Sequence, residues 1–137
     1  MPSQTYDLHG VRIFECAVEG PQLRSDRDAV DLMSEAGGPG ANFIVIPAER
    51  LSDDFFRLKT RVAGEIIQRF MMYRVRVAIV GDIAQHLAES DSLRDFVREA
   101  NRGNQCWFVA DLDELSKRLE REKTRAGDFG GGLNNAQ

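Results

Sequence analysis

The chain has 137 residues, of which 42% are hydrophobic and 29% charged, and its 18 basic and 22 acidic residues give a formal net charge of −4. This composition is typical of a single globular domain and excludes an intrinsically disordered chain. The acidic balance argues against nonspecific binding of nucleic acid, because neutralising phosphates requires a basic surface.

No part of the sequence has the pattern of a membrane span or of a secretory signal. No apolar run approaches the length of about 18 residues that a membrane helix needs. Residues 1–7 contain neither a basic region nor an apolar stretch. We therefore expect a cytoplasmic protein that has no membrane partner.

The first half of the chain predicts a hairpin, a helix and a buried strand. Residues 5–8 and 11–17 are strand-like on either side of a His-Gly pair, and a glycine in a two-residue break is a hairpin signal. A helix is expected to begin at Ser25 and to end at the glycines and proline of residues 37–40. The continuous apolar run of residues 43–46 is typical of a strand covered on both faces, as in a parallel sheet.

The central segment predicts a long amphipathic helix. Ser52 is placed to cap this helix, and apolar residues recur every three to four positions as far as Tyr73. A break near residues 58–60 divides it into a short turn and a main helix. Gly64 inside the apolar stripe predicts a close approach between this helix and the sheet, since a helix glycine otherwise costs about 1 kcal/mol relative to alanine.

The remaining elements complete an alternating pattern. Strands are expected over residues 75–80 and 106–109, with a short helical turn after Asp82 and helices beginning near Asp91 and Asp111. The order β-β-α-β-α-β-α-β-α implies right-handed parallel crossovers, with the hairpin adding an antiparallel edge.

We therefore expect a single α/β domain over residues 1–122. It should have a four- to five-stranded, mostly parallel sheet, an N-terminal antiparallel hairpin and about four helices. Residues 123–137 lose the apolar pattern and are rich in Gly and Asn, which predicts a flexible C-terminal tail.

Three carboxylates follow predicted strands. Glu49, Asp82 and Asp111 stand where parallel strands end, which is where open α/β sheets bind ligands, and Mg²⁺ prefers oxygen ligands. The alternative interpretation is that Asp82 and Asp111 cap helices. His86, one turn after Asp82, is interpreted either as a surface helix residue or as a base.

Two cysteines, Cys16 and Cys106, lie in separate strand-like segments without a C-x-x-C pair or a Cys–His cluster. They are interpreted as two buried reduced thiols, with a redox pair as the alternative. The chain also contains no Walker, dinucleotide-binding or nucleophile-elbow pattern. We therefore expect no catalytic residue, no cofactor and no bound metal.

Aromatic and basic residues are concentrated in one short segment. A partner-binding face is predicted there, because aromatic and arginine side chains are enriched at interfaces. Its residues are Phe55, Arg57, Lys59, Thr60 and Arg61. The alternative interpretation is that the two phenylalanines belong to the core and that the basic residues form a solvated face.

Four segments carry a resemblance to a known family. They read DFFRLKTRVAGEIIQRF at residues 54–70, YRVRVAIVGD at 73–82, SLRDFV at 92–97 and EANRG at 99–103. The chain resembles the bacterial family catalogued as domain of unknown function 4180, over about residues 5–119. This family has no established activity, so the resemblance implies a fold and a bacterial source but no chemistry.

The order of elements is more distantly similar to the sulfate-transporter and anti-sigma-factor-antagonist (STAS) domains. In the regulatory members of that family, a Ser or Thr at the start of the helix after the central strand is phosphorylated. By position, the resemblance points to Thr60 first and to Ser52 second. The usual Asp-Ser-Ser-Gly motif is replaced here by LKTR at residues 58–61.

Three functions remain open at this point. The first is a non-catalytic regulatory or protein-binding module with a STAS-like fold. The second is a small-molecule- or metal-binding enzyme that uses Glu49, Asp82 and Asp111 at the strand ends. The third is a structural subunit that buries an apolar patch against a second copy as a homodimer.

Overall fold

The computed structural model describes residues 3–38 and 40–136, with side chains as far as Arg125. The strands are β1 (Gln4–Leu8), β2 (Val11–Glu15), β3 (Phe43–Pro47), β4 (Arg76–Val80) and β5 (Cys106–Val109). The helices are α1 (Asp26–Gly37), α2 (Val62–Met72), α3 (Ala84–Glu89), α4 (Asp91–Arg102) and α5 (Leu112–Ala136). Three 3₁₀ turns, η1 (Ala48–Arg50), η2 (Asp53–Phe56) and η3 (Leu58–Thr60), connect β3 to α2.

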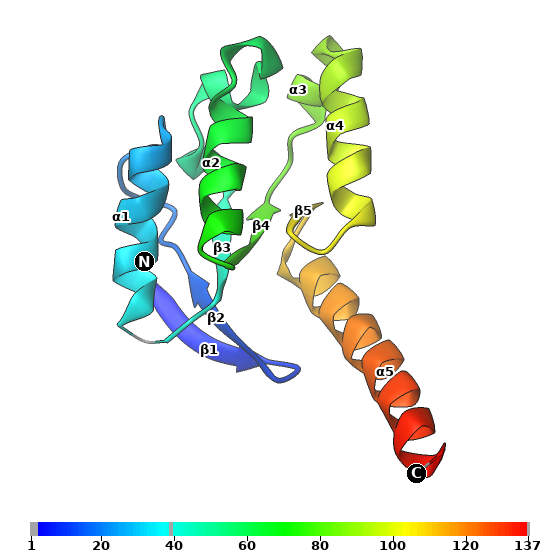
Figure 1. Cartoon of the computed structure of the whole chain (residues 1–137). Coiled ribbons are helices and arrows are strands. Elements are labelled where there is room, and N and C mark those ends of the chain that lie inside the picture. The colour runs from blue at the N-terminus through cyan, green and yellow to red at the C-terminus, as the bar shows by residue number, and fades with distance from the viewer. Residues whose placement is uncertain (1–2, 39, 137) are drawn as a thin grey trace.

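The five strands form one sheet in the order β1-β2-β3-β4-β5 (Figure 1). The β1–β2 pair is an antiparallel hairpin, and the other three pairs are parallel. This architecture confirms the predicted α/β class, the hairpin and the mostly parallel sheet.

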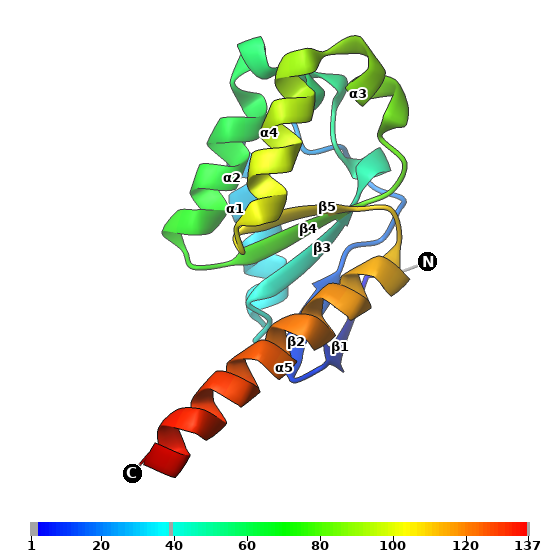
Figure 2. The ribbon, with the colours of Figure 1, turned by 90° about the vertical axis from the view of Figure 1, so that its right-hand side faces the viewer.

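The helices are divided unequally between the two faces of the sheet. Figure 2 shows α1, α2 and α4 on one face and α5 on the other. Because consecutive parallel strands are adjacent, right-handed crossovers place all three connecting helices on the same side. In the part of the chain that the structure describes, α5 follows β5 and no further strand does, so the chain turns at Asp111 and covers the second face with α5.

Alternation along the strands builds two cores. In β3, Ile44 and Ile46 pack toward the three helices, whereas Phe43 and Val45 belong to the cluster on the α5 face. Both faces of β3 are therefore buried, as its continuous apolar run predicts. The smaller cluster includes the α5 residue Leu119, which is 1% exposed.

Both cysteine side chains lie in the larger core and are buried as free thiols. Removal from water raises the pKa of Cys16 and of Cys106 to about 12. In this environment both groups are protonated at neutral pH.

Two details of the central segment differ from expectation. Gly64 is exposed, and a Cβ at this position would meet no atom within 4 Å, so the prediction of close helix–sheet packing was wrong. The Ser52 side chain makes no capping hydrogen bond, and α2 begins ten residues later at Val62. The predicted break near residues 58–60 is present, because η3 ends at Thr60 and α2 begins separately at Val62.

Helix α5 continues to Ala136, beyond Glu122, where the sequence predicts a change to a flexible tail. The flexibility predicted for residues 123–137 is not tested by these bounds and stays a prediction. None of the helices in the described part of the chain is long and apolar enough to span a membrane.

Candidate functional site

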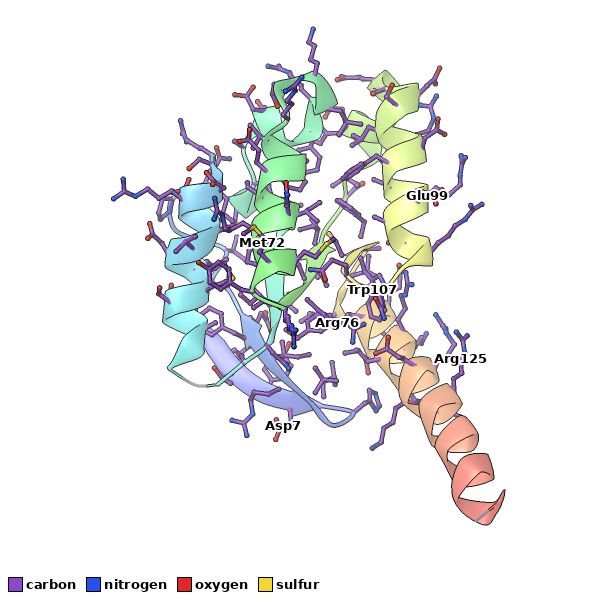
Figure 3. All side chains as sticks on the ribbon, in the orientation of Figure 1. Asp7, Met72, Arg76, Glu99, Trp107 and Arg125 are labelled. Atoms are coloured by element: carbon purple, nitrogen blue, oxygen red, sulfur yellow. The ribbon has the colours of Figure 1, made fainter. Side chains whose placement is uncertain are left out.

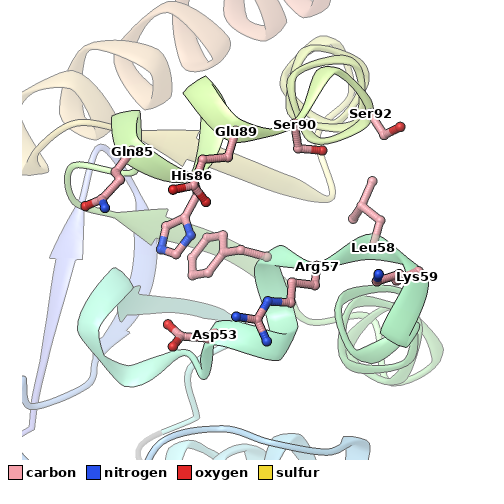
Figure 4. Close-up of a pocket in the computed structure, with 10 residues that line it drawn as sticks. Asp53, Arg57, Leu58, Lys59, Gln85, His86, Glu89, Ser90 and Ser92 are labelled. Atoms are coloured by element: carbon pink, nitrogen blue, oxygen red, sulfur yellow. The ribbon is translucent and has the colours of Figure 1, made fainter.

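A groove of about 660 Å³ lies beyond the carboxyl ends of β3 and β4. We call it the strand-end groove. Its lining comes from η2 and η3 on one side and from α3 and the start of α4 on the other: Asp53, Phe56, Arg57, Leu58, Lys59, Gln85, His86, Glu89, Ser90 and Ser92. Figure 4 shows Arg57 and Lys59 along one side and Gln85, Glu89 and Ser90 along the other.

Local hydrogen bonds determine the shape of the η2–η3 wall. The Thr60 hydroxyl oxygen lies 2.6 Å from the carbonyl oxygen of Asp54 and 2.7 Å from that of Arg57, and it accepts from the Val62 N–H at 3.3 Å. Arg61 then adopts a left-handed backbone with φ of 68°, which turns the chain into α2. These contacts hold two short turns, η2 and η3, in place where the sequence predicts one short turn before the main helix.

A stacked aromatic pair joins the two sides of the groove. The rings of Phe56 and His86 are 4.1 Å apart between centroids and 11° from parallel. Phe56 also meets Phe55 edge to face, and Phe55 packs near Phe108 of β5. The floor of the groove is therefore continuous with the hydrophobic core.

A smaller pocket of about 450 Å³ adjoins the groove and shares Asp53, Phe56 and His86 with it. Glu49 and Asp82 both line this pocket. The close approach of the two strand ends depends on Gly81, whose φ is +144° and where a Cβ would lie only 3.0 Å from the Ala48 Cβ. The structure thus brings together two of the three predicted carboxylates.

Asp111, the third carboxylate, and Asp82 both form local hydrogen bonds at the start of a helix. The Asp111 Oδ1 accepts a hydrogen bond from the Glu114 N–H at 2.8 Å at the start of α5, and the Asp82 Oδ1 accepts from the Ala84 N–H at 2.9 Å before α3. Both contacts satisfy helix N-terminal donors. Among the residues that the structure describes, no group of three or more His, Cys, Asp or Glu side chains is placed to hold a metal ion.

The family model for a domain of unknown function, DUF4180, matches residues 8–119. The chain belongs to this family. No curated protein and no solved structure matches it. The DUF4180 region contains every lining residue of the strand-end groove and ends at Leu119, an α5 residue buried against the sheet.

The structure separates the five residues of the predicted partner-binding face in this DUF4180 domain. Phe55 is 1% exposed and supports the wall from beneath, so it cannot contact a partner directly. Arg57 and Lys59 are exposed and line the groove. Thr60 is partly buried within the turn, and Arg61 is exposed where α2 begins.

Sequence reasoning missed the opposite wall of the groove. Gln85, Glu89 and Ser90 belong to a short helix and its end, whose position over η2 depends on tertiary contacts. One signal was available, because His86 follows the end of β4 by six residues. A histidine at a strand end beside an aromatic-rich segment could have indicated the stacked pair.

Proposed function

We propose that this DUF4180 domain is a non-catalytic protein-binding module and that its partner occupies the strand-end groove. The observation that carries the proposal is the open groove at the carboxyl ends of two parallel strands, where α/β domains bind ligands. Its basic wall presents Arg57 and Lys59 to solvent. A partner with carboxylate side chains would match this wall.

The rigidity of the floor supports binding. Phe55 and Phe56 are buried, and Phe56 stacks on His86, so the exposed basic residues are attached to a packed base. A preformed surface loses little conformational entropy when a partner docks, which favours affinity.

The hydrogen bonds in the groove favour binding over catalysis. A nucleophilic mechanism needs a nucleophile and a base within hydrogen-bond reach. In the described part of the chain, His86 makes no hydrogen bond to a hydroxyl, thiol or carboxylate side chain, and its ring stacks on that of Phe56. The Ser90 hydroxyl accepts from the Leu93 N–H at 3.1 Å and caps α4.

Thr60 offers a means of regulation within this proposal. Its hydroxyl is positioned to donate to the carbonyl oxygens of Asp54 and Arg57. A phosphate would remove that donor and place a charge of about −1.5 to −2 against the same oxygens. Phosphorylation of Thr60 would therefore open the η2–η3 turn, displace Arg57 and weaken partner binding.

The proposal is tested with a photo-crosslinking amino acid at Lys59 and, as a control, at Arg98 on α4. We expect a protein from the source organism to be captured from position 59 and not from position 98. The purified partner should then bind the double variant Arg57→Glu, Lys59→Glu at least about tenfold more weakly than the parent.

A matched charge change elsewhere controls for nonspecific electrostatics. The double variant Arg98→Glu, Lys123→Glu alters exposed residues of α4 and α5 outside the groove. It should retain the affinity of the parent. Equal loss of affinity in both double variants, or capture of the same proteins from both positions, would show that the strand-end groove is not the interface.

A further inference from the structure

A second groove, of about 990 Å³, lies between α5 and the segment that joins α4 to β5. Four arginines line it: Arg102 at the end of α4, and Arg118, Arg121 and Arg125 on α5. We call it the arginine groove. Figure 3 shows Arg76 and Trp107 where the sheet meets α5, with Arg125 projecting from that helix.

The positive charge of the arginine groove is only partly neutralised. Of the two lining carboxylates, Glu122 already accepts two hydrogen bonds of 2.9 Å from Arg76. Arg102 pairs with Glu99 at 3.4 Å, but both side chains are largely exposed and such pairs contribute little. Arg121 and Arg125 have no ion pair among the side chains that the structure describes.

Arg118 is held in place without a carboxylate partner. Its guanidinium carbon lies 4.2 Å from the centroid of the Trp107 ring, and its Nη2 donates to the Asn101 carbonyl oxygen at 2.7 Å. Burial, and then the positive charge of Arg121, lower the pKa of Arg118. The carboxylates of Glu114 and Glu122 oppose this shift with a smaller effect, and neither forms an ion pair with Arg118 among the described side chains. An anion in the groove would restore part of the interaction that this partly buried cation loses with water.

We propose that the arginine groove binds a small anion that carries two or more phosphate groups. Guanidinium groups bind phosphate through pairs of parallel hydrogen bonds, which suits this lining. Arg118 and Arg125 are seven residues apart on α5, which is roughly 10 Å along a helix. Because the lining arginines of α5 are spread over this length, a diphosphate or triphosphate chain can contact more of them at once than a single phosphate can.

The aromatic residue of the groove argues for phosphate recognition rather than base recognition. Trp107 is 3% exposed, and the guanidinium groups of Arg118 and Arg76 lie over its ring. Single-stranded nucleic acid is bound by stacking its bases on exposed aromatic faces. No such face is offered here, so the charged phosphates themselves are the recognised feature.

Trp107 provides a direct test, because it is the single tryptophan of the chain. Its Nε1 donates at 2.7 Å to the carbonyl oxygen of Gly103, a lining residue of the groove. Tripolyphosphate, ATP, citrate and sulfate are titrated at constant ionic strength, and both tryptophan emission and heat of binding are recorded. We expect saturable binding of tripolyphosphate and ATP, and weaker or undetectable binding of citrate and sulfate.

The variant Arg121→Gln, Arg125→Gln should weaken tripolyphosphate binding by at least about tenfold, because hydrogen bonds to charged groups are lost. The control Arg24→Gln, Arg27→Gln makes the same charge change at exposed positions at and just before the start of α1 and should bind as the parent does. Urea unfolding verifies that both variants are folded. The proposal is overturned if the parent shows no saturable tripolyphosphate binding, or if the two variants bind equally.

Discussion

Arg76, the first residue of β4, is joined to Glu122 of α5 by two hydrogen bonds of 2.9 Å. The same guanidinium donates through Nε to the Asn104 carbonyl oxygen at 2.6 Å. Its carbon lies 5.1 Å from the ring centroid of Phe43 and 4.9 Å from that of Trp107. This one side chain therefore connects the sheet, the turn before β5 and α5.

Glu122→Gln should destabilise the domain by about 1–2 kcal/mol. The variant removes a charge-assisted pair of hydrogen bonds and leaves Arg76 partly buried without its counter-ion. Urea unfolding measures the change. Glu65→Gln, at an exposed position of α2, is the control and should be within about 0.5 kcal/mol of the parent. A Glu122→Gln variant as stable as this control would show that the pair does not hold α5.

Truncation of α5 should have an effect that depends sharply on its end point. A chain ending at Glu122 keeps Leu119, which is 1% exposed, and the pair with Arg76, so its melting temperature should stay within a few degrees of the parent. A chain ending at Arg118 loses both and should fall by more than about 5 °C. Similar melting temperatures for the two truncations would contradict this account of how α5 docks.

The order and type of the strands could be predicted because each depends on local pattern. The apolar run of β3 and the glycine of the β1–β2 turn predict a buried parallel strand and a hairpin, and both are present. Right-handed crossovers between these strands then predict a mostly parallel sheet. The helical extent beyond Glu122 could not be predicted, because a Gly-rich composition opposes helix formation.

The candidate site could be predicted only in part, because its walls are assembled by tertiary contacts. Glu49 and Asp82, both expected at strand ends, line the same small pocket, and the ligand or metal site suggested for them stays a prediction. The sequence left open whether Phe55 belongs to the core or to an interface, since a short aromatic and basic segment has the same pattern on a surface as over a core edge. The hydrogen bonds of Thr60 within its turn could not be predicted.

Gly64→Ala should stabilise the domain by up to about 1 kcal/mol. The position is exposed within α2, a Cβ meets nothing within 4 Å, and alanine has the higher helix propensity. Gly81→Ala is the opposite case, because its φ of +144° and the Ala48 Cβ at 3.0 Å both oppose a side chain. It should lose at least about 1 kcal/mol. Urea midpoints that move in the same direction for both variants would refute this reading of the two glycines.

Thr60→Val should cost about 1–2 kcal/mol. Valine keeps the shape of threonine but can neither donate to the Asp54 and Arg57 carbonyl oxygens nor accept from the Val62 N–H. Thr60→Ser keeps the hydroxyl and should recover most of the loss. Thermal unfolding of the three proteins compares them. Equal losses in the two variants would show that the methyl group, and not the hydroxyl, holds the turn.

Stability should decrease above pH 9 because of the two buried thiols. Burial raises the pKa of Cys16 and of Cys106 from 9.0 to about 12 in the folded chain. Between these values the unfolded chain has released thiol protons that the folded chain retains, so the free energy of unfolding falls as pH rises. The expected loss by pH 10 is about 1 kcal/mol for each thiol.

The pH dependence of Cys106→Ala isolates one of these contributions. The variant should be less stable at neutral pH, because it leaves a cavity in the core, yet its unfolding free energy should fall less steeply between pH 8 and about pH 10. In the native parent at neutral pH, both thiols should react with a thiol reagent far more slowly than in the denatured chain, because each is buried and protonated. Two results together would show that the core does not shield Cys106. These are an unfolding free energy that falls with pH as steeply in the variant as in the parent, and rapid labelling of the native parent.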